Sequence, residues 1–170
     1  MVTHVRPPTF AVDDTDKAAL AKKSGQRVVF TPENDRIIIM CRIVLGLMKK
    51  DTNRSTYPFV EIRDILHEYC TDSFDKTAPN CRTRLFTLMK NPKNVLTVKV
   101  CVAEYSSRQE FVGVADRKLP FRQTFISTVK RIIQLSRTQA SSLEDTSQLS
   151  SSQNYILEAS FTEDDPCLYN

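Results

Sequence analysis

The chain has 170 residues, of which 41% are hydrophobic and 26% are charged, and this suits one domain of ordinary size or a smaller domain with tails. Its three glycines are too few for glycine-rich phosphate loops or for an all-β fold with many tight turns. The longest apolar run, residues 37–41, is far shorter than a membrane span. The first residues lack an apolar stretch of signal-peptide length. We therefore expect neither a membrane segment nor secretion.

The net charge of +4 is distributed unevenly along the chain. Residues 27–99 carry a net charge of +5 and residues 100–135 carry +3, whereas residues 136–170 carry −5. A basic centre followed by an acidic end bears on the partners that the protein would bind.

Residues 1–26 are predicted to be a disordered lead-in, because Pro7, Pro8 and the mixed charges after them provide no apolar face. Only a short, weak helix over residues 17–23 is considered within this segment, and Ser24 and Gly25 would stop it.

The first firm helix is predicted to begin at Thr31. Thr31 is suited to the N-cap and Pro32 to the first helical position, and two acidic residues follow in the first turn. Lys49 and Lys50 are suited to the C-terminus of the helix, where cations complement its dipole. The apolar residues that recur at helical spacing between these ends are Ile38, Cys41, Val44, Leu45 and Met48.

Two more helices are predicted to follow within the basic centre. The second begins near Pro58 and carries an apolar face that ends at Tyr69. The third begins at Thr77 and ends at Asn91, because Pro92 disfavours helical conformation in the residue before it. Basic side chains lie largely on the outer side of this third helix.

The sequence pattern after Asn94 predicts one clear helix and leaves other segments open. Residues 95–102 are rich in β-branched residues and predict either a strand or a helix imposed by tertiary context. A further helix is predicted from Pro120 to Leu135. Residues 136–170 are predicted to form an acidic, Ser-rich disordered tail. The apolar motif that runs from Tyr155 to Phe161 is either a docking peptide or a chance cluster.

The three central helices resemble a Myb/SANT repeat. The residues that carry this resemblance are Phe30, Thr31, Glu33 and Asp35, then Phe59, Ile62, Ile65 and Leu66, then the run 80–88. Myb repeats have tryptophan at three aromatic positions, and here Phe30, Phe59 and Leu85 stand in its place. The resemblance implies a mainly α fold, a three-helix Myb/homeodomain-like bundle over 27–93. An extension over 94–135 would add a C-terminal helix, and both tails would be disordered.

A narrower resemblance is to a segment of the largest subunit of transcription factor IIIC, which binds the B box of tRNA genes for RNA polymerase III. The matching residues are Phe30, Thr31, Glu33, Asp35, Arg36, Thr77, Pro79, Cys81, Arg82, Arg84, Leu88, Lys90, Asn91 and Pro92. This resemblance implies a nuclear protein that is one piece of a far larger subunit. It implies double-stranded DNA and other subunits of a transcription complex as partners, with no membrane and no small-molecule substrate.

The third helix is expected to be the recognition helix of a helix-turn-helix unit. Arg82 and Arg84 would donate hydrogen bonds to guanine or phosphate, and Asn80 would read adenine or extend the helix cap. The alternative for each arginine is a solvated face, or an ion pair with Glu33 or Asp35 inside the bundle. The candidate DNA-binding residues are Asn80, Arg82, Thr83, Arg84, Thr87, Lys90 and Lys93, with Lys49, Lys50 and Arg54 near the first loop.

A SANT-type protein-interaction module without base contacts is the alternative function. No acidic residue lies between Thr77 and Asn94, and this favours DNA over that alternative. The acidic tail could also fold back over the basic helices and compete with DNA.

No enzyme, cofactor or metal site is expected. No Ser-His-Asp or Cys-His pair has supporting spacing, and His67 is expected to be a partly exposed helix residue. The five cysteines include no C-x-x-C pair, which argues against zinc and favours reduced, mostly buried thiols.

Overall fold

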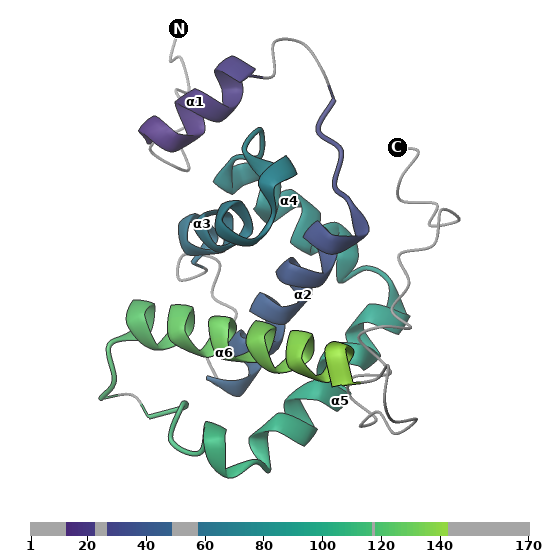
Figure 1. Ribbon diagram of the computed structural model, residues 1–170, viewed down its shortest axis with the longest axis vertical. Coiled ribbons are helices and arrows are strands. Elements are labelled where there is room, and N and C mark those ends of the chain that lie inside the picture. Colours follow the sequence, from purple (N-terminus) through teal and green to yellow (C-terminus); the bar gives the residue numbers. More distant parts are fainter. Residues whose placement is uncertain (1–12, 23–26, 49–57, 117, 143–170) are drawn as a thin grey trace, which may run out of the picture.

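The computed structural model describes residues 13–22, 27–48, 58–116 and 118–142, and these are helical with no strand (Figure 1). The α-helices are α1 (Asp14–Lys22), α2 (Pro32–Leu47), α3 (Phe59–Tyr69), α4 (Ala78–Leu88), α5 (Pro92–Ser106) and α6 (Phe121–Ser142). Two short 3-10 helices are also present, η2 (Thr71–Ser73) and η3 (Gln109–Phe111). None of the helices in these segments is long and apolar enough to cross a membrane.

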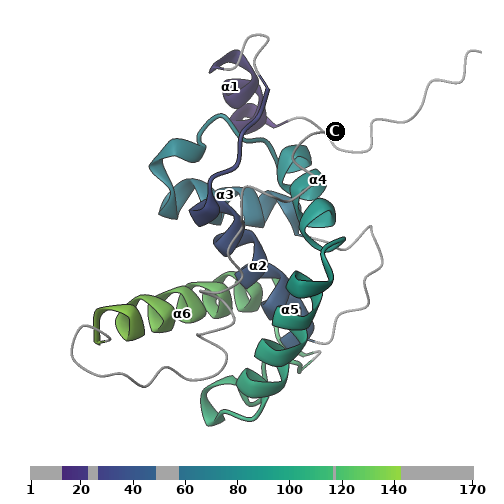
Figure 2. The same ribbon diagram turned by 90° about the vertical axis from the view of Figure 1, so that its right-hand side faces the viewer.

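Helix α2 is the centre of the fold and packs against α3, α4, α5 and α6 (Figures 1 and 2). The sequence predicted one apolar face for this helix, but Ile37, Ile38 and Ile39 are consecutive and are each at most 2% exposed. A helix that is apolar on all sides must be covered on all sides. The predicted face was therefore too narrow, and the additional cover comes from α5 and α6.

The beginnings of α2 and α4 are fixed by matching capping boxes. Thr31 Oγ1 accepts a hydrogen bond from the Asn34 backbone N–H at 3.2 Å, and Asn34 Oδ1 accepts one from the Thr31 N–H at 3.1 Å. Thr77 and Asn80 repeat this exchange at 3.2 and 3.0 Å. Each box satisfies two backbone donors that a helix start otherwise leaves without partners. The predicted N-cap at Thr31 and the predicted helix start at Thr77 are confirmed.

Residues 95–102 belong to α5, so the strand alternative for them is wrong. Asn91 caps this helix by accepting a hydrogen bond from the Lys93 N–H at 3.0 Å, and Pro92 occupies its first turn. Packing against α2 decides the conformation here, because β-branched residues have only a weak preference for strands. The two helices come close at Gly46, where a Cβ would lie 2.7 Å from Cγ2 of Val102.

Helix α1 lies in the expected disordered lead-in. The short helix considered over residues 17–23 is present, but it begins earlier, at Asp14, so the expected disorder is wrong for residues 13–16. Asp16 and Ala19 are buried, and Arg63 of α3 donates hydrogen bonds to Asp16 at 2.9 Å and to Asp13 at 2.7 Å. Asp16 Oδ1 also accepts the N–H of Ala78, the first residue of α4. These polar contacts hold a helix that has little apolar surface of its own. Residues 1–12 and 23–26 lie outside the described part of the chain.

Helix α6 extends past Leu135, so the prediction of a disordered tail is wrong for residues 136–142. The rest of that predicted tail, residues 143–170, lies outside the described residues. The apolar face of α6 includes Phe125, Val129 and Ile132, and it joins one hydrophobic core with α2, α3, α4 and α5. The extension expected over residues 94–135 therefore shares its hydrophobic core with the helices before it.

The prediction of reduced, buried thiols is confirmed for four of the five cysteines. Cys41, Cys70, Cys81 and Cys101 are free and buried. Burial raises the pKa of the Cys81 thiol to about 12, because the low dielectric disfavours the thiolate. Cys167 lies outside the described residues.

Candidate nucleic-acid interface

Seven of the ten residues that the sequence predicted to contact DNA lie on α4, in the turn after it and in the first turn of α5. Thr83 and Lys90 are exposed, and Arg82 and Thr87 are half-buried. Arg82, Thr83 and Thr87 belong to α4, where their spacing places them on neighbouring rows of the helix surface, and Lys90 follows in the turn after α4. Lys93 is exposed in the first turn of α5, directly after this surface. These five predicted residues are therefore at least partly exposed along one continuous stretch of the chain, residues 82–93.

Arg84 is not part of this outer surface. Its guanidinium donates two hydrogen bonds to the Asp35 carboxylate, at 2.7 and 2.6 Å, and also lies 5.7 Å from the centre of the Phe30 ring. The two side chains are 12% and 2% exposed. Of the two roles considered for this arginine, the structure therefore has the ion pair inside the bundle.

Asn80 and Thr87 both have local hydrogen bonds. Asn80 completes the capping box at the start of α4, so its side-chain oxygen is engaged by the Thr77 N–H. The Thr87 hydroxyl donates to the carbonyl of Thr83 at 3.0 Å. Asn80 therefore takes the cap role that the sequence left open beside adenine recognition.

The lysines on this side form no ion pair with the described residues. Lys90, Lys93 and Lys99 are exposed, and in the described part of the chain none has an acidic group within ion-pair distance. The sequence explains this, because residues 76–103 contain no Asp or Glu. We call Arg82, Lys90, Lys93 and Lys99 the α4–α5 basic face. The sequence analysis did not include Lys99 among the candidates. Lys99 lies on the exposed side of α5, to which residues 95–102 belong.

An apolar groove adjoins the basic face where α2, α4 and α5 meet. The groove has a volume of about 260 Å³. Its lining residues are Arg42, Leu85, Phe86, Met89, Val95, Val98 and Lys99. Phe86 is 37% exposed, and the Arg82 guanidinium lies 5.7 Å from the centre of its ring. The surface thus offers apolar contact area beside cationic groups.

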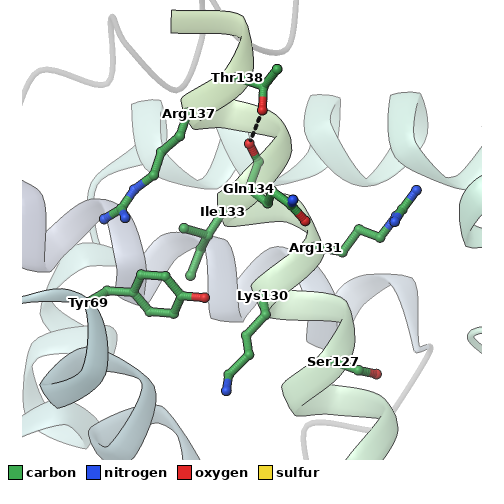
Figure 3. A pocket seen from close by; sticks show the side chains of 8 residues that line it. All are labelled: Tyr69, Ser127, Lys130, Arg131, Ile133, Gln134, Arg137 and Thr138. Carbon is green, nitrogen blue, oxygen red and sulfur yellow. Dashed lines mark hydrogen bonds between the residues drawn. The ribbon is translucent and has the colours of Figure 1, made fainter. Parts of the chain in front are cut away.

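A second groove, of about 510 Å³, lies between α6 and the end of α3 (Figure 3). It is lined by Tyr69, Ser127, Lys130, Arg131, Ile133, Gln134, Arg137 and Thr138. Figure 3 shows Lys130 and Arg137 extending on the side of Tyr69, whereas Arg131 points to the opposite side of α6. The Arg137 guanidinium lies 5.0 Å from the centre of the Tyr69 ring. The sequence analysis did not identify this groove.

The cations of α6 differ from those of the basic face because acidic groups of other elements neutralise them. The ion pairs are Arg122–Glu61 at 3.2 Å, Lys130–Glu68 at 2.9 Å, Arg131–Glu110 at 3.5 Å and Arg137–Glu33 at 3.9 Å. The hydrogen bond to Glu68 raises the pKa of Lys130. These pairs connect α6 with α2, α3 and η3, so the basic residues of α6 serve to orient the helix on the bundle.

The remaining predicted residues do not add to the interface. Lys49, Lys50 and Arg54 lie outside the described residues. His67 is half-buried, and its Nε2 lies 2.9 Å from the carbonyl oxygen of Lys76. In the described segments, no three His, Cys, Asp or Glu side chains group in a way that could hold a metal ion.

Comparison with known proteins gives a partial match. No protein-family model matches the chain, and no solved structure matches it. The chain is 31% identical to human General transcription factor 3C polypeptide 1 over 101 residues, which are 59% of the chain and 5% of that protein. The mouse and rat proteins of the same name are each 30% identical over 101 residues. The chain thus spans about a twentieth of these relatives, and more than half of it is similar to a segment of General transcription factor 3C polypeptide 1.

Proposed function

We propose that the chain is a nuclear DNA-binding module of a transcription complex that serves RNA polymerase III, and that it contacts duplex DNA through the α4–α5 basic face. The similarity to General transcription factor 3C polypeptide 1 supports a role in such a transcription complex. One observation carries the DNA contact: the exposed lysines of α4–α5 have no described carboxylate nearby, whereas acidic groups neutralise the cations of α6.

The contact would be made mainly to the phosphate backbone. Lys90, Lys93 and Lys99 provide flexible point charges, which bind phosphates without reading sequence. Arg84 is engaged by Asp35, so the contact would rest on the lysines rather than on this arginine. A module of this kind binds duplex DNA with little sequence preference, and its orientation on DNA would come from the other subunits of the complex.

The helical arrangement supports a Myb-like reading of this module. Helices α2, α3 and α4 pack against one another over the residues that resemble a Myb/SANT repeat. In such a unit α4 is the recognition helix, and it is the helix on which the basic face begins.

The alternative is a SANT-type interaction module that holds other subunits and makes no base contacts. The apolar groove beside the basic face favours it, since exposed apolar surface such as Phe86 and Leu96 suits a protein partner better than phosphates.

The test is the salt dependence of binding between the full chain and a fluorescent DNA duplex. Lys90→Ala/Lys93→Ala/Lys99→Ala should weaken binding to all duplexes and reduce the slope of log K against log salt by up to about 2.7, or roughly 0.9 for each phosphate contact. The matched control is Lys130→Ala/Arg131→Ala/Arg137→Ala, which removes the same number of cations from α6. An equal loss of DNA affinity in the two triple variants would contradict the proposed role of the α4–α5 basic face. An absence of binding by the unmodified chain at low salt would favour the interaction module.

A further inference from the structure

The groove between α2, α4 and α5 combines apolar and cationic side chains. Its floor is formed by apolar side chains such as Met89 and Val98, and Phe86 stands 37% exposed within it. Arg42 and Lys99 line the same groove. In the described residues, neither of these two cations has an acidic partner. The chemistry fits a segment with apolar anchors and carboxylates.

The chain contains a segment of this composition. Residues 143–170 include six acidic residues and no lysine or arginine. Within them, Tyr155, Ile156, Leu157 and Phe161 provide apolar side chains, and Glu158, Glu163, Asp164 and Asp165 alternate with or follow them. The segment is therefore complementary to the groove in both charge and apolar content.

The described helices place the start of this segment within reach of the groove. Arg137, near the end of α6, pairs with Glu33 in the first turn of α2. Arg84 of α4 pairs with Asp35 in that same turn, and Leu85 next to it lines the groove. Residues 143–154 can span about 40 Å when extended, which is about four times the diameter of a helix.

We infer that residues 155–165 of this chain dock in the groove, with Ile156 and Phe161 against Phe86 and Met89 and with carboxylates beside Arg42 and Lys99. The docked segment covers part of the α4–α5 basic face. The inference does not depend on whether that face binds DNA, because it rests on the groove and on the composition of the segment.

The test uses the full chain with a spin label on Cys167. The four described cysteines are buried and free, and burial raises the pKa of their thiols, so few thiolates form there at neutral pH and the label reacts at Cys167. We expect the amide signals of Phe86, Met89 and Lys99 to lose intensity in nuclear magnetic resonance spectra. The signal of Ser127, on the second groove, should keep its intensity.

Matched variants decide between docking and a nonspecific tail contact. Ile156→Ser/Phe161→Ser should restore the α4–α5 signals, whereas Leu149→Ser, an apolar change elsewhere in the same segment, should not. Arg42→Glu/Lys99→Glu changes only the groove and should reduce the loss of signal intensity at Phe86 and Met89. Equal broadening of Ser127, or no broadening of Phe86, would overturn the inference. A further control mixes isotope-labelled chains that carry no spin label with spin-labelled chains. Broadening of the Phe86 signal in that mixture would also overturn the inference, because the docked segment would then come from a second copy.

Discussion

Arg84 and Asp35 form a two-point ion pair that joins α4 to the first turn of α2. Arg84 Nε and Nη2 donate to the two carboxylate oxygens at 2.7 and 2.6 Å. Asp35 is 2% exposed, so water does not compensate for a missing partner. The pair thus fixes how the candidate recognition helix sits on the central helix.

We predict that Arg84→Ala lowers the free energy of unfolding by about 3–5 kcal/mol, because it leaves a buried carboxylate without its partner. Chemical denaturation measures the change. Lys90→Ala, a change of an exposed cation nearby, should stay within about 0.5 kcal/mol. A double-mutant cycle with Asp35→Asn should show strong coupling. Additive effects of the two changes would contradict the importance of the pair.

Arg63 should be equally important for keeping α1 on the bundle. Its side chain is 2% exposed and donates to Asp13, Asp16 and Asp64. Burial lowers the pKa of Arg63, but these carboxylates more than offset that effect and raise it overall. We predict that Arg63→Ala costs about 3–5 kcal/mol in unfolding free energy and exposes residues 13–22 to proteolysis. Arg122→Ala, which breaks an exposed ion pair, is the control and should leave the cleavage pattern unchanged.

Attachment of α1 should also depend on pH through Asp13. The Asp16 N–H and the Arg63 guanidinium lower the pKa of Asp13 below its ordinary value of 3.8. A carboxyl whose pKa is lower in the folded state contributes stability above its unfolded pKa and loses it as the pH falls through the folded pKa. The difference in unfolding free energy between the unmodified chain and Asp13→Asn should therefore be constant near neutral pH and shrink below about pH 4. A difference that stayed constant down to lower pH would contradict this assignment.

Gly46 should resist replacement even though it lies in a helix. Alanine is favoured over glycine in helices by about 1 kcal/mol, but its Cβ would lie 2.7 Å from Cγ2 of Val102. Val102 is β-branched and has little freedom to move away. We predict that Gly46→Ala lowers thermal stability, because overpacking costs about 1–3 kcal/mol. In a chain that also carries Val102→Ala, Gly46→Ala should raise thermal stability. Higher thermal stability of Gly46→Ala alone would refute the close packing of α2 and α5.

Local signals in the sequence located most of the helices. Thr31, Thr77 and Pro92 mark boundaries by hydrogen bonding and by steric restriction between neighbouring residues, and those effects act over a few positions. The absence of acidic residues between Thr77 and Asn94 favoured DNA contacts on this part of the chain, and these contacts stay a prediction. The cysteine spacing predicted mostly buried thiols, and the four described cysteines are buried.

Contacts between residues distant in the sequence determined the features that the sequence left open or predicted wrongly. The helix over residues 95–102, the attachment of α1 through Arg63, and the ion pairs of α6 depend on partners that lie elsewhere in the chain. The sequence alone established which residues are basic. Only the tertiary structure separated Arg84, which a carboxylate on α2 draws into the bundle, from Lys90, Lys93 and Lys99, which have no described carboxylate nearby. Charge is a property of the residue, whereas its availability depends on which opposite charge the fold places next to it.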